Sequence, residues 1–183
     1  DSVNEFQKKR YQSDKITVPV STNLSWMDFY DEKIMNWLEK KCADVSMPSG
    51  LSRMEITETS YAAIEADRSA TLEALREAGI LLLLDDFGSG YSSFGMLQNY
   101  NFDIMKIDMS FVRQIETNTK TRSIIRFIIE MAHTMDIKII AEGAETKEQV
   151  EFLRDNGCDY IQGYYFYKPM PEEEFVKLLD AGR

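Results

Sequence analysis

The strongest structural signal in the chain is the stretch Ile80-Leu81-Leu82-Leu83-Leu84-Asp85-Asp86-Phe87-Gly88-Ser89-Gly90. Five consecutive apolar residues followed by turn residues are typical of a β-strand that is buried on both faces, as in a parallel sheet. Gly88 and Gly90 allow the backbone to turn tightly after the strand. Asp85 and Asp86 repel each other, and a bound cation would most easily keep both ionised. The stretch therefore predicts a buried strand that ends either at a metal site or in a simple acidic turn.

On both sides of this strand, short β-prone runs alternate with amphipathic helical segments. We expect further strands at residues 16–20, 51–57, 102–108, 137–141 and 159–163. We expect helices at residues 30–45, 69–78, 91–100, 121–135 and 146–156, and from Pro171 onward. Strands that alternate with helices form parallel sheets with helical crossovers, so this order predicts an α/β fold.

The length of the chain limits how much of a barrel it can form. A (β/α) barrel of eight units needs about 250 residues, whereas this chain has 183. We therefore expect one partial domain over residues 1–183, a TIM-like (β/α) barrel truncated at the N-terminus to about six β/α units. Residues 1–15 are polar and resemble the tail of a surface helix, which places the missing units at the front.

Local patterns refine two of the helices. The helix at residues 121–135 is expected to bury one face, made of Ile124, Ile128, Met131 and Met135. Thr146 and Gln149 have the spacing of a capping box, in which each side chain bonds the other residue's backbone N–H. They predict that the next helix begins just after Thr146.

Composition excludes several classes of function. The net charge of −10 argues against a basic face for duplex nucleic acid, although bound metal ions could still attract a phosphate substrate. No apolar run approaches the roughly 20 residues that cross a bilayer, and no secretory signal opens the chain. Cys42 and Cys158 do not form a disulfide framework and suit a reducing compartment. We expect a cytoplasmic segment without membrane contact.

Each predicted strand ends on or near a polar or charged side chain. The strand ends carry Asn23, Glu55, Asp85 with Asp86, Lys106, Glu142 and Gln162. In a (β/α) barrel these ends converge on one face, where active sites lie. No His or Cys is among these strand-end residues, which argues against zinc. Carboxylate and amide oxygens suit Mg²⁺ or Mn²⁺. Two such ions about 4 Å apart would suit phosphodiester hydrolysis.

Six motifs in this order carry a family resemblance. They are Thr22-Asn23-Leu24-Ser25, Met54-Glu55-Ile56-Thr57-Glu58, residues 84–93 (Leu-Asp-Asp-Phe-Gly-Ser-Gly-Tyr-Ser-Ser), Met105-Lys106-Ile107-Asp108, Ala141-Glu142-Gly143-Ala144-Glu145-Thr146 and Ile161-Gln162-Gly163-Tyr164. With these motifs the sequence resembles the EAL-domain phosphodiesterases of bacterial cyclic-di-GMP signalling, from about Ile16 to the C-terminus.

The resemblance implies a modified TIM barrel that hydrolyses cyclic-di-GMP to linear pGpG with two Mg²⁺ or Mn²⁺ ions. It also implies that Ca²⁺ inhibits this hydrolysis. By position, it implies a set of metal ligands in which Asp85 bridges both ions: Asn23, Glu55, Asp85, Asp86 and Glu142. Lys106 resembles the lysine that positions the attacking water, and Gln162 resembles a further contact to that water. Glu58 resembles the residue that holds the loop after Asp86, which the family couples to substrate binding and dimerisation.

The resemblance leaves more than one function open. Ser89 and Ala144 replace a more usual threonine and valine, which are mild changes. The Glu-Ala-Leu motif that names the family, with a further metal ligand, is absent because the chain starts after it. An alternative is therefore a catalytically inactive cyclic-di-GMP-binding or regulatory module, and a third reading is another metal-dependent TIM-barrel hydrolase or lyase. The resemblance also implies a homodimer, with sensory or GGDEF domains in a longer protein.

Overall fold

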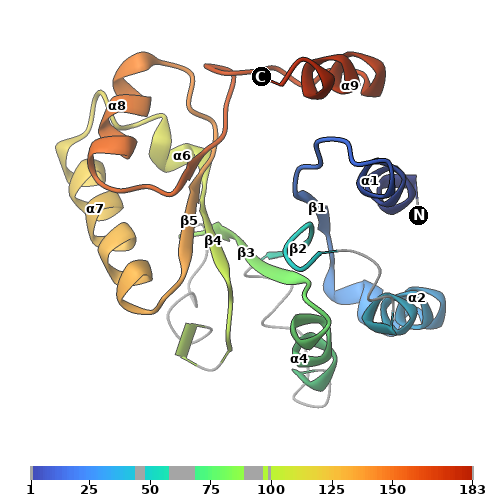
Figure 1. Ribbon diagram of the computed structural model, residues 1–183. Coiled ribbons are helices and arrows are strands. Elements are labelled where there is room, and N and C mark those ends of the chain that lie inside the picture. The colour runs from blue at the N-terminus through green and yellow to red at the C-terminus, as the bar shows by residue number, and fades with distance from the viewer. Residues whose placement is uncertain (1, 44–47, 58–68, 89–96, 99, 183) are drawn as a thin grey trace. The chain divides into compact units, whose positions relative to one another are not determined.

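The computed structural model describes residues 2–43, 48–57, 69–88, 97–98 and 100–182 (Figure 1). The chain divides into two compact units. Unit 1 comprises Asp1–Glu55, Ile64–Leu81 and Pro169–Arg183, and unit 2 comprises Ile56–Ala63 and Leu82–Lys168. The predicted helix at residues 91–100 lies almost entirely outside the described residues.

Unit 1 contains helices from both ends of the chain around two parallel strands. Its elements are α1 (Ser2–Gln12), β1 (Val20–Asn23), the 3₁₀ helix η1 (Trp26–Tyr30), α2 (Glu32–Ala43), most of β2 (Ser52–Thr57), α4 (Ser69–Glu77) and α9 (Glu172–Asp180). The register of the two strands pairs Val20 with Ser52 at one end and Asn23 with Glu55 at the other.

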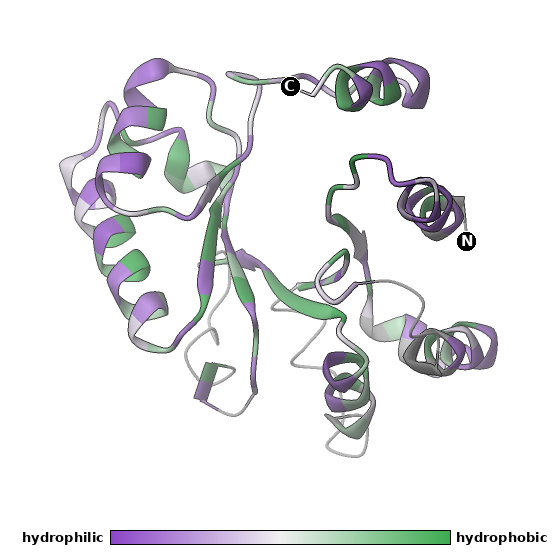
Figure 2. Ribbon diagram, in the orientation of Figure 1, coloured by the Kyte–Doolittle hydropathy of each residue, from purple (hydrophilic) through white to green (hydrophobic). Residues whose placement is uncertain are grey.

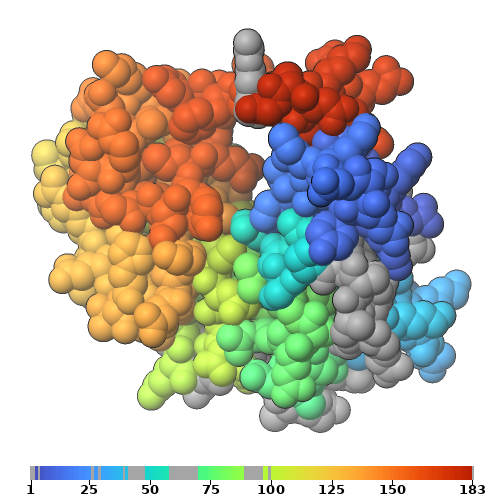
Figure 3. Space-filling model, viewed as in Figure 1, coloured from blue at the N-terminus to red at the C-terminus, as the bar shows by residue number. Residues whose placement is uncertain are grey.

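Unit 2 contains parallel strands whose order follows the sequence. Its elements are nearly all of β3 (Leu81–Phe87), β4 (Ile104–Ile107), α6 (Met109–Val112), α7 (Thr119–Thr134), β5 (Lys138–Ala141), α8 (Lys147–Asp155) and β6 (Tyr160–Ile161). β3 pairs with β4, β4 with β5 and β5 with β6, all in parallel. Figure 1 shows α7 and α8 side by side, and their side chains form a continuous surface in Figure 3.

The core of unit 2 consists of its strands and the inner faces of the helices. All four residues of β4 are buried, as expected for a parallel strand that is covered on both faces. Leu83, Leu84 and Ile139 have no exposed surface. Figure 2 shows the same arrangement, with hydrophobic strands and amphipathic helices. The parallel α/β organisation that the sequence predicted is therefore confirmed.

Several element boundaries differ from the predictions. β1 begins at Val20, at the point where the predicted strand ends, because Pro19 has no N–H to donate to a ladder. β6 comprises two residues rather than five. The capping box of Thr146 and Gln149 is present as predicted.

The buried face of α7 was predicted incorrectly in part. Ile128 is buried, but Ile124 and Met135 are 45% and 41% exposed. The residues that α7 buries are Thr121, Ile125, Ile128, Ile129 and Ala132. Apolar residues occupy two adjacent stripes along this helix. Their spacing is the same in both, so it could not tell which stripe is buried.

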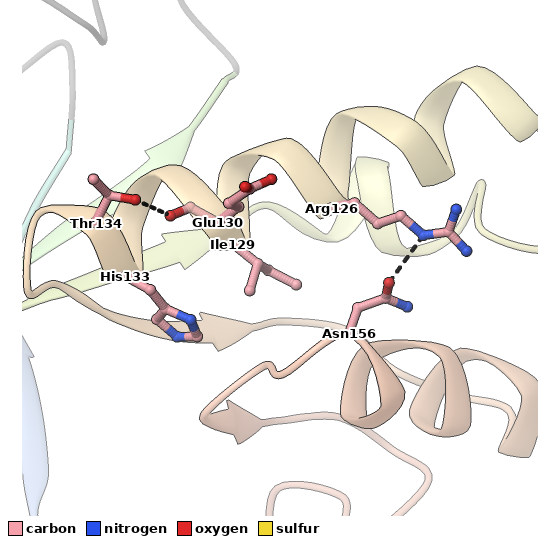
Figure 4. A pocket seen from close by; sticks show the side chains of 6 residues that line it. All are labelled: Arg126, Ile129, Glu130, His133, Thr134 and Asn156. Atoms are coloured by element: carbon pink, nitrogen blue, oxygen red, sulfur yellow. Dashed lines mark hydrogen bonds between the residues drawn. The ribbon is translucent and has the colours of Figure 1, made fainter.

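Asp159 ties the C-terminal end of α7 to the beginning of β5. Its carboxylate accepts bonds from His133 Nε2 (2.9 Å), Lys138 Nζ (2.8 Å) and the Ile139 N–H (3.0 Å). Burial, the largest effect, disfavours the charge, but these hydrogen bonds together lower the pKa of Asp159 below its usual value. His133 also lines a cleft of about 620 Å³ beside Arg126 and Asn156 (Figure 4).

We expect Asp159→Asn to lower the melting temperature at pH 7 by about 2–4 °C. A carboxyl group with a lowered pKa stabilises the fold above its unfolded-state pKa, and this contribution is lost as the pH falls through the folded-state value. The difference between mutant and wild type should therefore shrink below about pH 4. Thermal melts between pH 3 and pH 8 would measure it, with the exposed Asp155→Asn as control. A difference that does not change with pH would contradict the assignment.

Candidate functional site

The two adjacent aspartates, Asp85 and Asp86, form a β-bulge in β3. Leu84 pairs with Met105 and Phe87 pairs with Ile107, so two residues of β3, Asp85 and Asp86, lie opposite the single residue Lys106 of β4. In a regular strand neighbouring side chains point to opposite faces, and a bulge interrupts this alternation. The aspartates thus lie inside β3, whereas the sequence predicted a strand that stopped before them and ended either at a metal site or in an acidic turn.

Asp86 has the backbone conformation that the bulge requires. Its φ angle is +57°, a left-handed value that costs energy for most residues but is tolerated best by Asn and Asp. The Asp86 N–H donates to Oδ1 of Asp85 at 3.0 Å. Strained backbone of this kind is concentrated at functional sites, so the geometry favours a site here.

Lys106 of β4 bridges two carboxylates, one in β3 and one directly after β5, the two strands that flank β4. Its Nζ lies 2.9 Å from Oδ1 of Asp85 and 2.8 Å from Oε1 of Glu142. The lysine side chain is 5% exposed, and the carboxylates are 13% and 18% exposed. A charge buried this deeply needs partners of opposite charge. The structure therefore brings three predicted site residues into direct contact.

The short helix α6 packs against the backbone next to both carboxylates. A Cβ at Gly143 would lie 2.6 Å from Cβ of Met109, and a Cβ at Gly88 would lie 2.9 Å from the Phe111 ring. Asp108 caps α6 by accepting a bond from the Ser110 N–H. This helix was not predicted from the sequence, although aspartate is one of the residues preferred at a helix N-cap.

Asn23 and Glu55 are brought together in unit 1. Asn23, the last residue of β1, pairs with Glu55 of β2, so their side chains lie on the same face of the sheet. The Leu24 N–H donates to the Glu55 carbonyl at 2.8 Å and continues the ladder past this pair. Asn23 is exposed and Glu55 is half-buried, so a ligand can reach them.

The structure describes only one of the two remaining predicted residues, Gln162 and Glu58. Gln162 is exposed and directly follows β6, and its backbone N–H donates to the Ala141 carbonyl at 2.9 Å. Gly163 lies so close to Ala144 that a Cβ there would be 2.0 Å from a carbonyl oxygen, which fixes the chain beside Gln162. Glu58 lies outside the described residues, and so do residues 89–96.

The chemistry of these side chains suits a hard divalent cation. Among the described residues, no three His, Cys, Asp or Glu side chains are arranged as a preformed metal site. The carboxylates of Asp85 and Glu142 instead share the Lys106 ammonium. Carboxylate and amide oxygens are the donors that Mg²⁺ and Mn²⁺ prefer, so the residues present fit such ions.

Comparison with known proteins identifies the family. A family model described as the EAL domain matches residues 2–169, and the chain belongs to this family. Cyclic di-GMP phosphodiesterase NbdA of Pseudomonas aeruginosa is 43% identical over 61% of this chain and 14% of its own length. This chain spans 14 to 30% of the length of such curated relatives.

Solved structures confirm the fold. The EAL domain of Mycobacterium smegmatis DcpA superposes with a TM-score of 0.85 and 27% identity, covering 97% of this chain and 80% of that one. Klebsiella pneumoniae BlrP1, in a complex with manganese and cyclic di-GMP, gives 0.71 and 28% identity over 80% of this chain and 38% of its own. The predicted TIM-like (β/α) class is thereby confirmed.

None of the helices that the structure describes has the length and hydrophobicity needed to span a bilayer.

We expect Lys106→Met to lower the free energy of unfolding by about 3 kcal/mol, because removing one partner of a buried ion pair leaves uncompensated charges behind. Urea denaturation in the presence of a metal chelator would measure the loss. Lys120→Met is a matched control, because Lys120 lies on the exposed surface of α7. Equal unfolding midpoints for both variants would show that Asp85 and Glu142 do not depend on the ammonium.

Proposed function

We propose that this EAL domain is a metal-dependent phosphodiesterase that hydrolyses cyclic di-GMP to linear pGpG. The main support is the contact of Lys106 with Asp85 and Glu142, which joins the ends of three neighbouring strands of an EAL domain. The phosphodiesterase names of relatives such as NbdA, and the manganese complex of BlrP1, point the same way.

The proposed roles follow the chemistry of each side chain. The proposed ligands of the ions are Asn23, Glu55, Asp85, Asp86 and Glu142. Two bound Mg²⁺ or Mn²⁺ ions would supply the positive charge that activates a water and stabilises the developing charge on the phosphate. Lys106 is suited to donate a hydrogen bond to the attacking water, because its ammonium has three donors and already lies between two carboxylates.

The remaining assignments extend the same proposal. Gln162 would make a further contact to the attacking water, and Glu58 would hold the loop that follows Asp86. Ca²⁺ would inhibit by taking the place of the active ion, because it prefers longer bonds and more ligands than Mg²⁺. Cytoplasmic action, a homodimer and linkage to sensory or GGDEF domains remain predictions from the family resemblance.

A cyclic-di-GMP-binding or regulatory module without turnover is the second candidate. The observation that favours it is that one oxygen of Asp85 and one oxygen of Glu142 are already bound by the Lys106 ammonium. A nucleotide could bind such a domain without any metal to activate water. Calorimetry with cyclic di-GMP and Ca²⁺, alongside a turnover assay with Mg²⁺, separates the two functions.

We expect Asp85→Asn to lower Mn²⁺-dependent hydrolysis of cyclic di-GMP by more than about a hundredfold. Loss of a residue that merely supports a metal ligand typically costs about 10- to 100-fold, and Asp85 is proposed to bind both ions. The measurement is pGpG formation, followed by chromatography, in this chain and in a version extended at its N-terminus.

Asp136→Asn provides the matched control for that variant. Asp136 is exposed and has a φ angle of +58°, which asparagine also tolerates, so it undergoes the same chemical change away from the site. Undiminished hydrolysis by Asp85→Asn would contradict the proposed role of Asp85 as a ligand of both ions. Binding of cyclic di-GMP without turnover in both versions of the wild type would support the module instead.

A further inference from the structure

Helix α1 contains two polar side chains that are almost completely buried. Gln7 is 2% exposed and Arg10 is 5% exposed, although the helix as a whole is strongly polar. Burying a polar group is unfavourable unless its hydrogen bonds are replaced. The partners of these two side chains therefore show what holds α1 in unit 1.

Gln7 joins the amino ends of β1 and β2. Its Nε2 donates to the carbonyl of Val18 at 3.0 Å and to the carbonyl of Leu51 at 2.9 Å. Val18 lies two residues before β1, and Leu51 directly precedes β2. The Leu51 carbonyl also accepts the first ladder bond, from the Val20 N–H at 2.9 Å. The two N–H groups of one side-chain amide thus connect both strands.

The register of β1 depends on few other bonds. The strand has four residues, and within the described part of the chain its strand partner is β2. Pro19, just before it, has no N–H to contribute. Register is specified weakly where neither face of a strand is buried, and none of the four residues of β1 is buried. A slip of one residue would turn every side chain to the other face. At the carboxyl end, this register sets the pairing of Asn23 with Glu55.

We propose that Gln7 is a positioning residue for the metal ligands Asn23 and Glu55. By binding the carbonyls of Val18 and Leu51, it fixes the register that places the amide of Asn23 beside the carboxylate of Glu55. This inference rests on the proposed function, which makes those two residues metal ligands. A displacement of α1 would accordingly weaken metal binding at the opposite ends of the two strands.

Arg10 holds the same helix by contacts that do not involve the strand carbonyls. Its Nε donates to the Ile16 carbonyl at 2.8 Å, and its guanidinium pairs with Asp180 of α9 at 2.7 Å. Asp180→Asn therefore weakens the attachment of α1 to α9 and leaves both bonds of Gln7 in place. This variant is a control for a general loosening of α1.

The test compares Mn²⁺ binding by Gln7→Met and Asp180→Asn with that of the wild-type chain. Methionine has nearly the length of glutamine but cannot donate a hydrogen bond. Two lost bonds correspond to an effect of about tenfold, so we expect Gln7→Met to raise the Kd for Mn²⁺ by about that factor in calorimetry. Asp180→Asn should stay within about twofold of wild type. Equal affinities of Gln7→Met and wild type would overturn the proposal.

Hydrogen exchange gives a readout that does not depend on metal. In metal-free protein, the amides of Val20 and Leu24 should exchange faster in Gln7→Met than in Asp180→Asn, because both amides donate across β1 and β2. Unchanged exchange would overturn the register role. Failure of the wild-type chain to bind Mn²⁺ would overturn the proposed function, while the exchange data would still test Gln7 by itself.

A milder variant covers the case in which Gln7→Met does not fold, as judged by circular dichroism. Gln7→Asn keeps the amide but shortens its reach by one methylene, so it can satisfy only one carbonyl well. An Mn²⁺ affinity between those of wild type and a tenfold loss supports the proposal. Wild-type affinity together with wild-type exchange at Val20 and Leu24 overturns it.

Discussion

The buried ammonium of Lys106 between two carboxylates is the interaction on which the candidate site depends. Removing a lysine from water is costly, and only nearby opposite charges make it tolerable. Asp85 of β3 and Glu142, directly after β5, supply those charges at 2.9 and 2.8 Å. The interaction therefore requires β3, β4 and β5 to keep one particular register. Any slip between these strands would leave the ammonium without a partner.

The bulge in β3 allows both adjacent aspartates to act as the proposed metal ligands. Without the extra residue, Asp85 and Asp86 would point to opposite faces of the sheet, and only one could approach Lys106. The bulge places both opposite that lysine at the cost of a left-handed backbone at Asp86. Aspartate is one of the few residues that accepts this conformation. The side chain that is proposed as a metal ligand thus also tolerates the required backbone.

Most of the fold could be predicted from the sequence, because buried parallel strands are continuous apolar runs and their helices are capped and periodic. The apolar first part of β3, up to Leu84, and the capping box at Thr146 follow from such local signals, whereas the continuation of β3 to Phe87 does not. The bulge could not be predicted, since it depends on the register with β4. The burial of Gln7 could not be predicted either, because its partners, the carbonyls of Val18 and Leu51, lie 11 and 44 residues away. Glu58 remains a prediction from the family resemblance.

The same kind of bond recurs where strands begin in both units. In unit 2, Asp103 accepts the Leu82 N–H near the start of β3 at 2.9 Å, and Asp159 accepts the Ile139 N–H near the start of β5 at 3.0 Å. In unit 1 the side chain is the donor instead, because Gln7 donates to backbone carbonyls just before β1 and β2. Side chains thus hold the backbone at the amino ends of strands, and the carboxyl ends are left for chemistry. This division agrees with the separation of stability and catalysis between the two faces of (β/α) barrels. It is also the physical basis for the proposed role of Gln7 in spacing the proposed ligands Asn23 and Glu55, because a strand with a fixed beginning and a fixed register has a fixed end.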